Sequence, residues 1–238
     1  MQRPLPATDR AFFLEYQITM NFKEATEALI EFQDKFGAGH KVVPSLVDNE
    51  KGMLRHSLMA EENTEYIEAC KAGDLVEVAG DLVEVADALG DMLYVLTGTI
   101  VEHGMQDIMP KVFREIHASN MSKLNARSNP LINGKNGIKD ETRPVGKILK
   151  FRGRNYHPPR LDKIVSKGVM RAKTEQSHMI FEIIQQIDFI LQTRSESEGI
   201  NNSLLTDVDD VDKLKKQRKK YSEKLAEYAY TKEEAQNL

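Results

Sequence analysis

The stretch that decides the fold is GDLVEVAGDLVEVADALGDMLYV, residues 73–95. Its acids recur every three or four residues, which places them on one face of a helix. They are Asp74, Glu77, Asp81, Glu84, Asp87 and Asp91. Apolar residues cover the rest of the circumference, and a helix of that kind is normally buried, so its acidic face should line a water-filled cleft. Neighbouring carboxylates repel one another, and a bound cation would offset that repulsion. We expect this cation to be Mg²⁺.

The same stretch contains an exact repeat, since GDLVEVA at 73–79 recurs at 80–86. Seven residues nearly preserve helical phase, with a drift of about 20°, so the second copy can extend the acidic face. Alternatively, the helix begins at Gly80 and Asp81 and the first copy is a loop. Either way the helix should end near Gly104.

Further helices are predicted on both sides of this one. One begins near Thr8 and Asp9, with a possible break at 19–21, and ends at Gly37; the next two cover 49–70 and 107–124. Residues 125–161 are rich in Asn, Gly and Pro and read as a loop with one short hairpin around 145–151. The predicted fold is all-α, with a core of four bundled helices.

The chain after residue 161 returns to helix. An apolar stripe runs from Met179 to Leu191, a polar linker follows at 195–203, and a last helix shows heptad-like spacing from Val211 to Tyr228. We therefore predict two domains, a core over 1–161 and a helical extension over 162–238. The extension is a helical hairpin or an oligomerisation arm.

Composition narrows the class of protein. The 238 residues are 40% hydrophobic and 29% charged, as in ordinary globular proteins, and the single cysteine, Cys70, excludes an internal disulfide and a cysteine-rich zinc site. No run approaches 18 apolar residues and the first ten residues lack the apolar block of a signal peptide, so we expect a cytoplasmic protein without membrane contacts.

Charge is distributed unevenly along the chain. Residues 61–91 hold ten acids and one lysine, whereas residues 111–160 hold twelve Lys or Arg and three acids. This pattern suits a polyphosphate held by a metal ion on one side and by cationic side chains on the other. A basic loop that is merely solvated is equally consistent with the charges alone. The basic run at 213–220 is better explained as a solvated helix face than as a nucleic-acid site.

Four carboxylates are the candidate metal ligands. Glu62 and Glu65 lie three residues apart on one predicted helix, and Glu84 and Asp87 lie three apart on the next, so two packed antiparallel helices could bring all four together. Carboxylates completed by water and phosphate suit Mg²⁺. Glu61 beside them could hold and deprotonate a water molecule.

The motif EENTE (61–65), followed after eighteen residues by EVAD (84–87), resembles the signature of the all-α nucleoside triphosphate pyrophosphohydrolases, the MazG-like and dimeric dUTPase superfamily. The resemblance covers about residues 12–161 and includes ADALGDMLYVLTGTIVEHG (86–104), VFREIHASNMSKL (112–124) and KFRGRNYHPPRL (150–161). In their order and sequence, these segments are similar to the branch of the superfamily that resembles phosphoribosyl-ATP pyrophosphohydrolase. Some members of that branch act as dUTPases.

The resemblance implies an enzyme that hydrolyses phosphoric anhydrides with Mg²⁺, or with Mn²⁺ in its place. It cleaves a nucleoside triphosphate between the α- and β-phosphates and releases a nucleoside monophosphate and pyrophosphate. It also implies a homodimer or a dimer of dimers. Carried onto this sequence, it assigns Glu62, Glu65, Glu84 and Asp87 to the metal, Glu61 to the attacking water, and Asp91, Tyr94, Asn120 and Lys123 to the substrate.

Three functions therefore stay open. The first is a pyrophosphohydrolase for a deoxynucleotide such as dUTP or dCTP, and the second is the same reaction on phosphoribosyl-ATP or a non-canonical nucleotide. The third, of another class, is a non-enzymatic helical scaffold or nucleic-acid-associated binding protein. Two features depart from the family pattern: the duplicated heptad, which leaves the roles of Asp74, Glu77 and Asp81 open, and the extension after residue 161.

Overall fold

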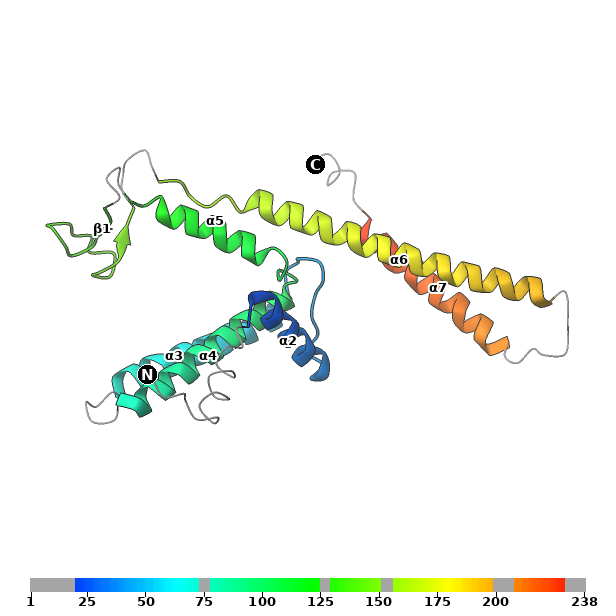
Figure 1. Cartoon of the computed structure of the whole chain (residues 1–238), viewed down its shortest axis with the longest axis horizontal. Helices are drawn as coiled ribbons and strands as arrows, with labels where there is room; N and C mark the ends of the chain where they lie inside the picture. Colours follow the sequence, from blue (N-terminus) through cyan, green and yellow to red (C-terminus); the bar gives the residue numbers. More distant parts are fainter. Residues whose placement is uncertain (1–19, 73–77, 125–128, 151–155, 199–207, 230–238) are drawn as a thin grey trace, which may run out of the picture. The chain divides into compact units, whose positions relative to one another are not determined.

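A computed structural model describes residues 20–72, 78–124, 129–150, 156–198 and 208–229. These ranges contain six helices and one two-stranded sheet, which confirms the all-α class and the additional C-terminal helices (Figure 1). The chain divides into two compact units, residues 1–164 and 165–238, and the division falls in the first turn of a helix.

Helix α2 (Phe22–Lys35) starts at a complete capping box. The Asn21 side chain accepts a hydrogen bond from the Glu24 backbone N–H (3.0 Å), and the Glu24 carboxylate accepts one from the Asn21 backbone N–H (2.8 Å). This start agrees with the predicted break at 19–21. The predicted helix beginning at Thr8 and Asp9 lies outside the described residues.

Helices α3 (Asn49–Ala72) and α4 (Val78–Glu102) run side by side, and α2 packs against α4 (Figure 1). Among the described residues of this unit, the largest fully buried apolar side chain is Val101. The other buried apolar residues of these helices and the turn after them are Leu29, Ala88, Ile100 and Ile108. The second copy of the heptad is helical, as predicted, whereas residues 73–77 of the first copy are outside the described part of the chain.

The end of α4 is fixed by the loop that joins α2 to α3. Lys41 N–H donates to the Val101 carbonyl (3.2 Å) and Ser45 N–H donates to the His103 carbonyl (2.9 Å). Gly104 then turns the chain with φ +69°, and a Cβ at this position would lie 2.7 Å from the Val43 carbonyl oxygen. Only glycine fits both the left-handed backbone and the close approach.

Helix α5 (Met109–Met121) is followed by the short antiparallel strands β1 (Leu131–Ile132) and β2 (Ile148–Leu149). The predicted hairpin region therefore supplies β2, and its partner strand comes from a segment that the sequence did not single out. Within the second unit, α6 (Asp162–Glu198) and α7 (Val208–Tyr228) are joined by Arg218, whose guanidinium donates two hydrogen bonds to the Asp188 carboxylate. One of these, from Nη2 to Oδ2, is 3.0 Å long.

Helix α6 continues further than the sequence predicted. It reaches Glu198, so a linker starting at residue 195 was wrong for residues 195–198. Serine and glutamate are tolerated in a helix, and their polar character alone does not end one. Among the described residues, no helix is both long and apolar enough to cross a membrane. The cytoplasmic location stays a prediction.

Candidate active site

The packing of α3 on α4 sets which carboxylates face one another. Arg55 of α3 donates through Nε to the Thr99 hydroxyl (2.9 Å) and through Nη2 to the Val95 carbonyl. Two helical turns further along α3, about seven residues, this antiparallel register brings Glu62 opposite Asp91. Asp87 lies one turn before Asp91 on α4, opposite Glu65. In this register the two antiparallel helices carry acids on facing sides, and the roles of these acids stay predictions.

Electrostatics show the same grouping. The Glu62 side chain is half-buried, and this loss of solvation is the largest cause of the raised pKa of its carboxyl group. The negative charges of neighbouring carboxylates raise the pKa further, in the order Glu65, Asp91, Glu61 and Asp87. Four predicted site residues, two from α3 and two from α4, therefore lie near enough to Glu62 to act on its carboxyl group.

The donor set fits a hard divalent cation. None of the acids at 61, 62, 65, 84, 87 and 91 forms an ion pair with another described residue, so their mutual repulsion is not offset within that part of the protein. All available ligands are carboxylate oxygens, which Mg²⁺ prefers. In the described ranges, however, no three acidic, histidine or cysteine side chains stand close enough to enclose an ion as they are. Ligation would require these side chains to adopt other rotamers.

A second group of predicted substrate residues lies at the C-terminal end of α5. Lys123 Nζ donates to the Asn120 side-chain oxygen (2.6 Å), so the structure brings these two together. The same turn is held by residue 157, since the buried Ser119 hydroxyl donates to the His157 carbonyl (2.9 Å) and His157 N–H donates to the Ser122 hydroxyl (3.1 Å). The end of α5 is thereby fixed to the chain segment that precedes α6.

Residues 29–120 match the family model of phosphoribosyl-ATP pyrophosphohydrolase. Over these residues the chain is similar to that family. The family lies within the MazG-like all-α superfamily of nucleoside triphosphate pyrophosphohydrolases, as the sequence motifs indicated, and its members are hydrolases acting on phosphoanhydride bonds. No curated protein matches the chain.

The matched segment contains the whole acidic cluster, Tyr94 and Asn120, and ends three residues before Lys123. Glu84 is the one predicted ligand that the structure does not bring to Glu62. It is exposed, it lies one turn before Asp87, and it is not among the residues that shift the pKa of Glu62. Its role as a ligand stays a prediction.

Tyr94 lies in an aromatic cluster beside the acids. Its ring meets the Phe32 ring edge-on, with 5.6 Å between centroids and an interplanar angle of 85°. The Phe32 ring in turn lies 4.4 Å from the Phe36 ring. All three side chains are partly open to solvent, so the domain offers aromatic faces next to the carboxylates, on which a nucleobase could stack.

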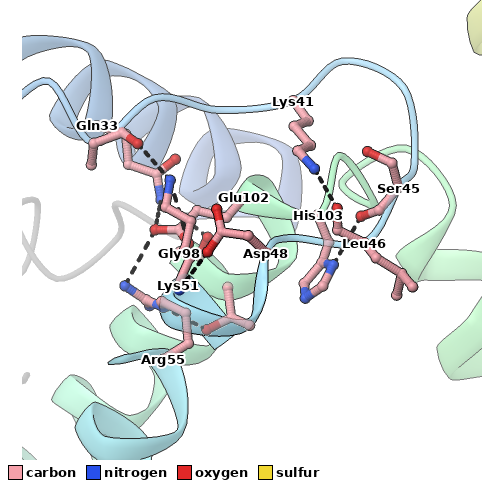
Figure 2. A network of polar contacts seen from close by, with 12 residues as sticks. Gln33, Lys41, Ser45, Leu46, Asp48, Lys51, Arg55, Gly98, Glu102 and His103 are labelled. Carbon is pink, nitrogen blue, oxygen red and sulfur yellow. Dashed lines mark hydrogen bonds and ion pairs between the residues drawn. The ribbon is translucent and has the colours of Figure 1, made fainter. Parts of the chain in front are cut away.

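A polar network that the sequence did not predict lies at the other end of the α3–α4 pair (Figure 2). Glu102, whose side chain is 4% exposed, lies 3.6 Å from Arg55 Nη1 and 3.9 Å from Lys51 Nζ. The buried Gln33 amide donates to the Gly98 carbonyl (3.0 Å) and lies 3.5 Å from the Glu102 carboxylate. The network thus ties α2, α3 and α4 together.

One signal could have revealed this network. Glu102 directly follows TGTIV within an apolar run, and a charge in such a place needs a buried partner. Gly98 is part of the same fit, because a Cβ there would lie 2.9 Å from Arg55 Nη2. The network positions α4 in register with α3 and so supports the acidic cluster indirectly.

Proposed function

We propose that the protein is a Mg²⁺-dependent nucleotide pyrophosphohydrolase that cleaves between the α- and β-phosphates and releases pyrophosphate. The observation that carries the proposal is the grouping of Glu61, Glu65, Asp87 and Asp91 around Glu62 within the family-matched segment. Five carboxylates without an offsetting cation among the described residues are costly to hold together, and a divalent ion with a polyphosphate makes that arrangement favourable. Similarity to a hydrolase family favours an enzyme over a helical scaffold.

The predicted site residues would bind the metal, the attacking water and the substrate. Glu62, Glu65, Glu84 and Asp87 would hold the metal, which when bound neutralises phosphate charge and lowers the pKa of a coordinated water molecule. Glu61, exposed beside Glu62, would orient the attacking water and accept its proton. Asp91 and Tyr94 would contact the nucleoside, and Asn120 with Lys123 would contact phosphate or sugar.

The substrate we place first is phosphoribosyl-ATP, because the matched family carries its name. The family match thus favours the second function that the sequence left open over dUTP or dCTP. A deoxynucleotide stays the second candidate, because the sequence resembles a branch of which some members act as dUTPases, and part of that resemblance, residues 150–161, lies beyond the match.

A nucleotide panel tests this proposal. Pyrophosphate release is measured from phosphoribosyl-ATP, dUTP, dCTP and the four standard ribonucleoside triphosphates, with Mg²⁺, with Mn²⁺ and with EDTA. We expect one substrate to exceed the others and EDTA to lower turnover by about 100-fold or more, since metal stabilises such a transition state by several kcal/mol. Absence of pyrophosphate from every nucleotide would support the scaffold reading instead.

We further propose that the protein is a homodimer formed through α4. Four leucines recur at helical spacing on the face of α4 opposite its acids, and each is about half exposed or more. They are Leu82, Leu89, Leu93 and Leu96. A row of this kind in a monomer leaves a contiguous apolar surface in water, which marks a protein interface. A second copy of the same helix would cover it.

Charge placed in this row should separate the subunits. We expect the double variant Leu93→Glu, Leu96→Glu to run as a monomer in sedimentation velocity, because it puts two carboxylates in the apolar contact on each side. Leu46→Glu is the matched control, since Leu46 is 84% exposed in the loop before α3. A wild-type protein that sediments as a monomer would contradict the proposal.

A further inference from the structure

A cavity outside the acidic cluster is built by the hairpin that follows α5. Strands β1 and β2 pair Leu131 with Leu149 and Ile132 with Ile148, and the cavity of about 1100 Å³ lies against them. Its wall includes Lys123, so it adjoins the end of α5 described above. No sequence motif assigned an individual role to the hairpin residues, although the basic segment 111–160 that contains them suited a polyphosphate.

Cations dominate the charged lining of this cavity. The lining contains five cationic side chains and two carboxylates, a formal charge of +3, and the cations are Lys123, Lys139, Arg143, Lys147 and Lys150. One lysine is neutralised locally, since Lys139 Nζ lies 2.9 Å from the Glu141 carboxylate. Arg143 and Lys147 form no ion pair with any residue in the described ranges. The cavity therefore holds positive charge that its own acids do not offset.

The loop around the cavity is rigidly built. Asn133 is 2% exposed, and its side-chain nitrogen donates to the carbonyls of Asp140 (2.9 Å), Arg143 (2.8 Å) and Pro144 (3.1 Å). Its side-chain oxygen accepts a hydrogen bond from the Asp140 backbone N–H (2.7 Å). One buried amide thus fixes the backbone from which Asp140 and Arg143 extend, and preorganised donors lose less entropy when an anion binds.

Tyr156 links the cavity to the end of α5. Lys150 Nζ lies 4.7 Å from the centre of the Tyr156 ring. The pKa of the Tyr156 phenol is lowered, chiefly by a hydrogen bond with Lys150, and smaller contributions come from Ser119 and Lys123. Lys123 and Lys150, 27 positions apart in sequence, therefore share one neighbour.

We propose that this cavity binds the polyphosphate chain of the nucleotide, with Lys147, Lys150 and Arg143 as phosphate-binding residues beside Lys123. This inference rests on the proposed function and extends it to residues outside the family-matched segment. Lysine and arginine side chains form charge-assisted hydrogen bonds to phosphate, and three adjacent phosphates need several donors from one side. A nucleic-acid strand fits less well, because such sites combine an extended groove with stacking aromatics, whereas Asp140 and Glu141 stand inside this compact cavity.

Binding of inorganic tripolyphosphate in EDTA tests the site without catalysis. By titration calorimetry we expect the wild-type chain to bind it, and Lys147→Gln and Lys150→Gln each to weaken binding about 10-fold, because each removes one charge-assisted contact. Lys135→Gln is the matched control, since Lys135 is exposed in the same loop but does not line the cavity. Equal affinity in all four proteins would overturn the inference, as would tighter binding of a single-stranded oligonucleotide than of tripolyphosphate.

Turnover separates this inference from the proposed function. If the wild type hydrolyses a nucleotide and the Lys147 and Lys150 variants keep its KM, the cavity plays no part in substrate binding and only the inference fails. If no nucleotide is cleaved but tripolyphosphate binding still depends on Lys147 and Lys150, the anion site is supported and the hydrolase is overturned. A rise in KM of about 10-fold in both variants, with Lys135→Gln unchanged, supports the two together.

Discussion

Turnover of Glu62→Gln, and of Asp87→Asn, is expected to fall by about 1,000-fold or more while the protein stays folded. Each substitution removes one negative oxygen from the group that would hold the metal, and metal stabilisation of a phosphoryl transition state is worth several kcal/mol. The measurement is the rate of pyrophosphate release with saturating Mg²⁺. Glu68→Gln is the matched control, because Glu68 is another exposed glutamate of α3 that has no effect on the pKa of Glu62.

The stability of Glu62→Gln provides a second readout with the opposite sign. Because the folded protein raises the pKa of Glu62, the stability that this group contributes is fully present below the ordinary pKa of a glutamate and is lost as pH rises through the raised value. In Mg²⁺-free buffer at neutral pH, Glu62→Gln should therefore melt no lower than the wild type, and the two should converge in acid. Loss of activity together with a large loss of stability at neutral pH would contradict a site role.

Arg55→Met is expected to lower the free energy of unfolding by about 3–5 kcal/mol. It leaves the buried Glu102 carboxylate without its closest cation, and removal of one partner of a buried ion pair costs about that much. For a protein of this size, roughly 10 °C in melting temperature corresponds to that loss. Thermal unfolding followed by circular dichroism measures it.

The controls distinguish a buried pair from an ordinary surface one. Lys35→Met removes the partner of Glu31, an exposed pair in which both side chains are about two-thirds accessible, and should change the melting temperature little. The double variant Arg55→Met, Glu102→Leu should recover part of the loss, since it removes both buried charges together. A double variant that is less stable than Arg55→Met alone would show that Glu102 is held chiefly by Lys51 and Gln33.

Periodicity predicted the helices well, because the local sequence determines their apolar and acidic faces. The starts and ends of α3 and α4 fall within a few residues of the expected bounds where they are described. Local sequence carries less information about where a polar helix stops. For this reason α6 extends beyond its predicted end and reaches Glu198. Strand pairing is also nonlocal, so the partner of β2 could not be found from the pattern around residues 145–151.

The site was predictable in part for the same reason. Helical spacing placed Glu61, Glu62 and Glu65 on one helix and Asp87 on the next, and packing then brought them within range of one another. Gln33 and Glu102 are in contact although they lie 69 positions apart in the sequence. Lys123 and Lys150 are likewise linked through their shared neighbour Tyr156. Such contacts depend on the tertiary arrangement, and no periodic pattern in either segment predicts them.

The two opposite faces of α4 limit the insertions that this helix can accept. A seven-residue insertion turns the helix by about 700°, close to two full rotations, so leucines and acids both stay where they were. Five added residues would instead rotate everything upstream by about 140°, turning leucines toward the proposed metal side and carboxylates toward the proposed dimer contact. Tandem duplication of GDLVEVA is therefore among the few length changes that this helix can accept without exchanging its acidic face and its leucine face.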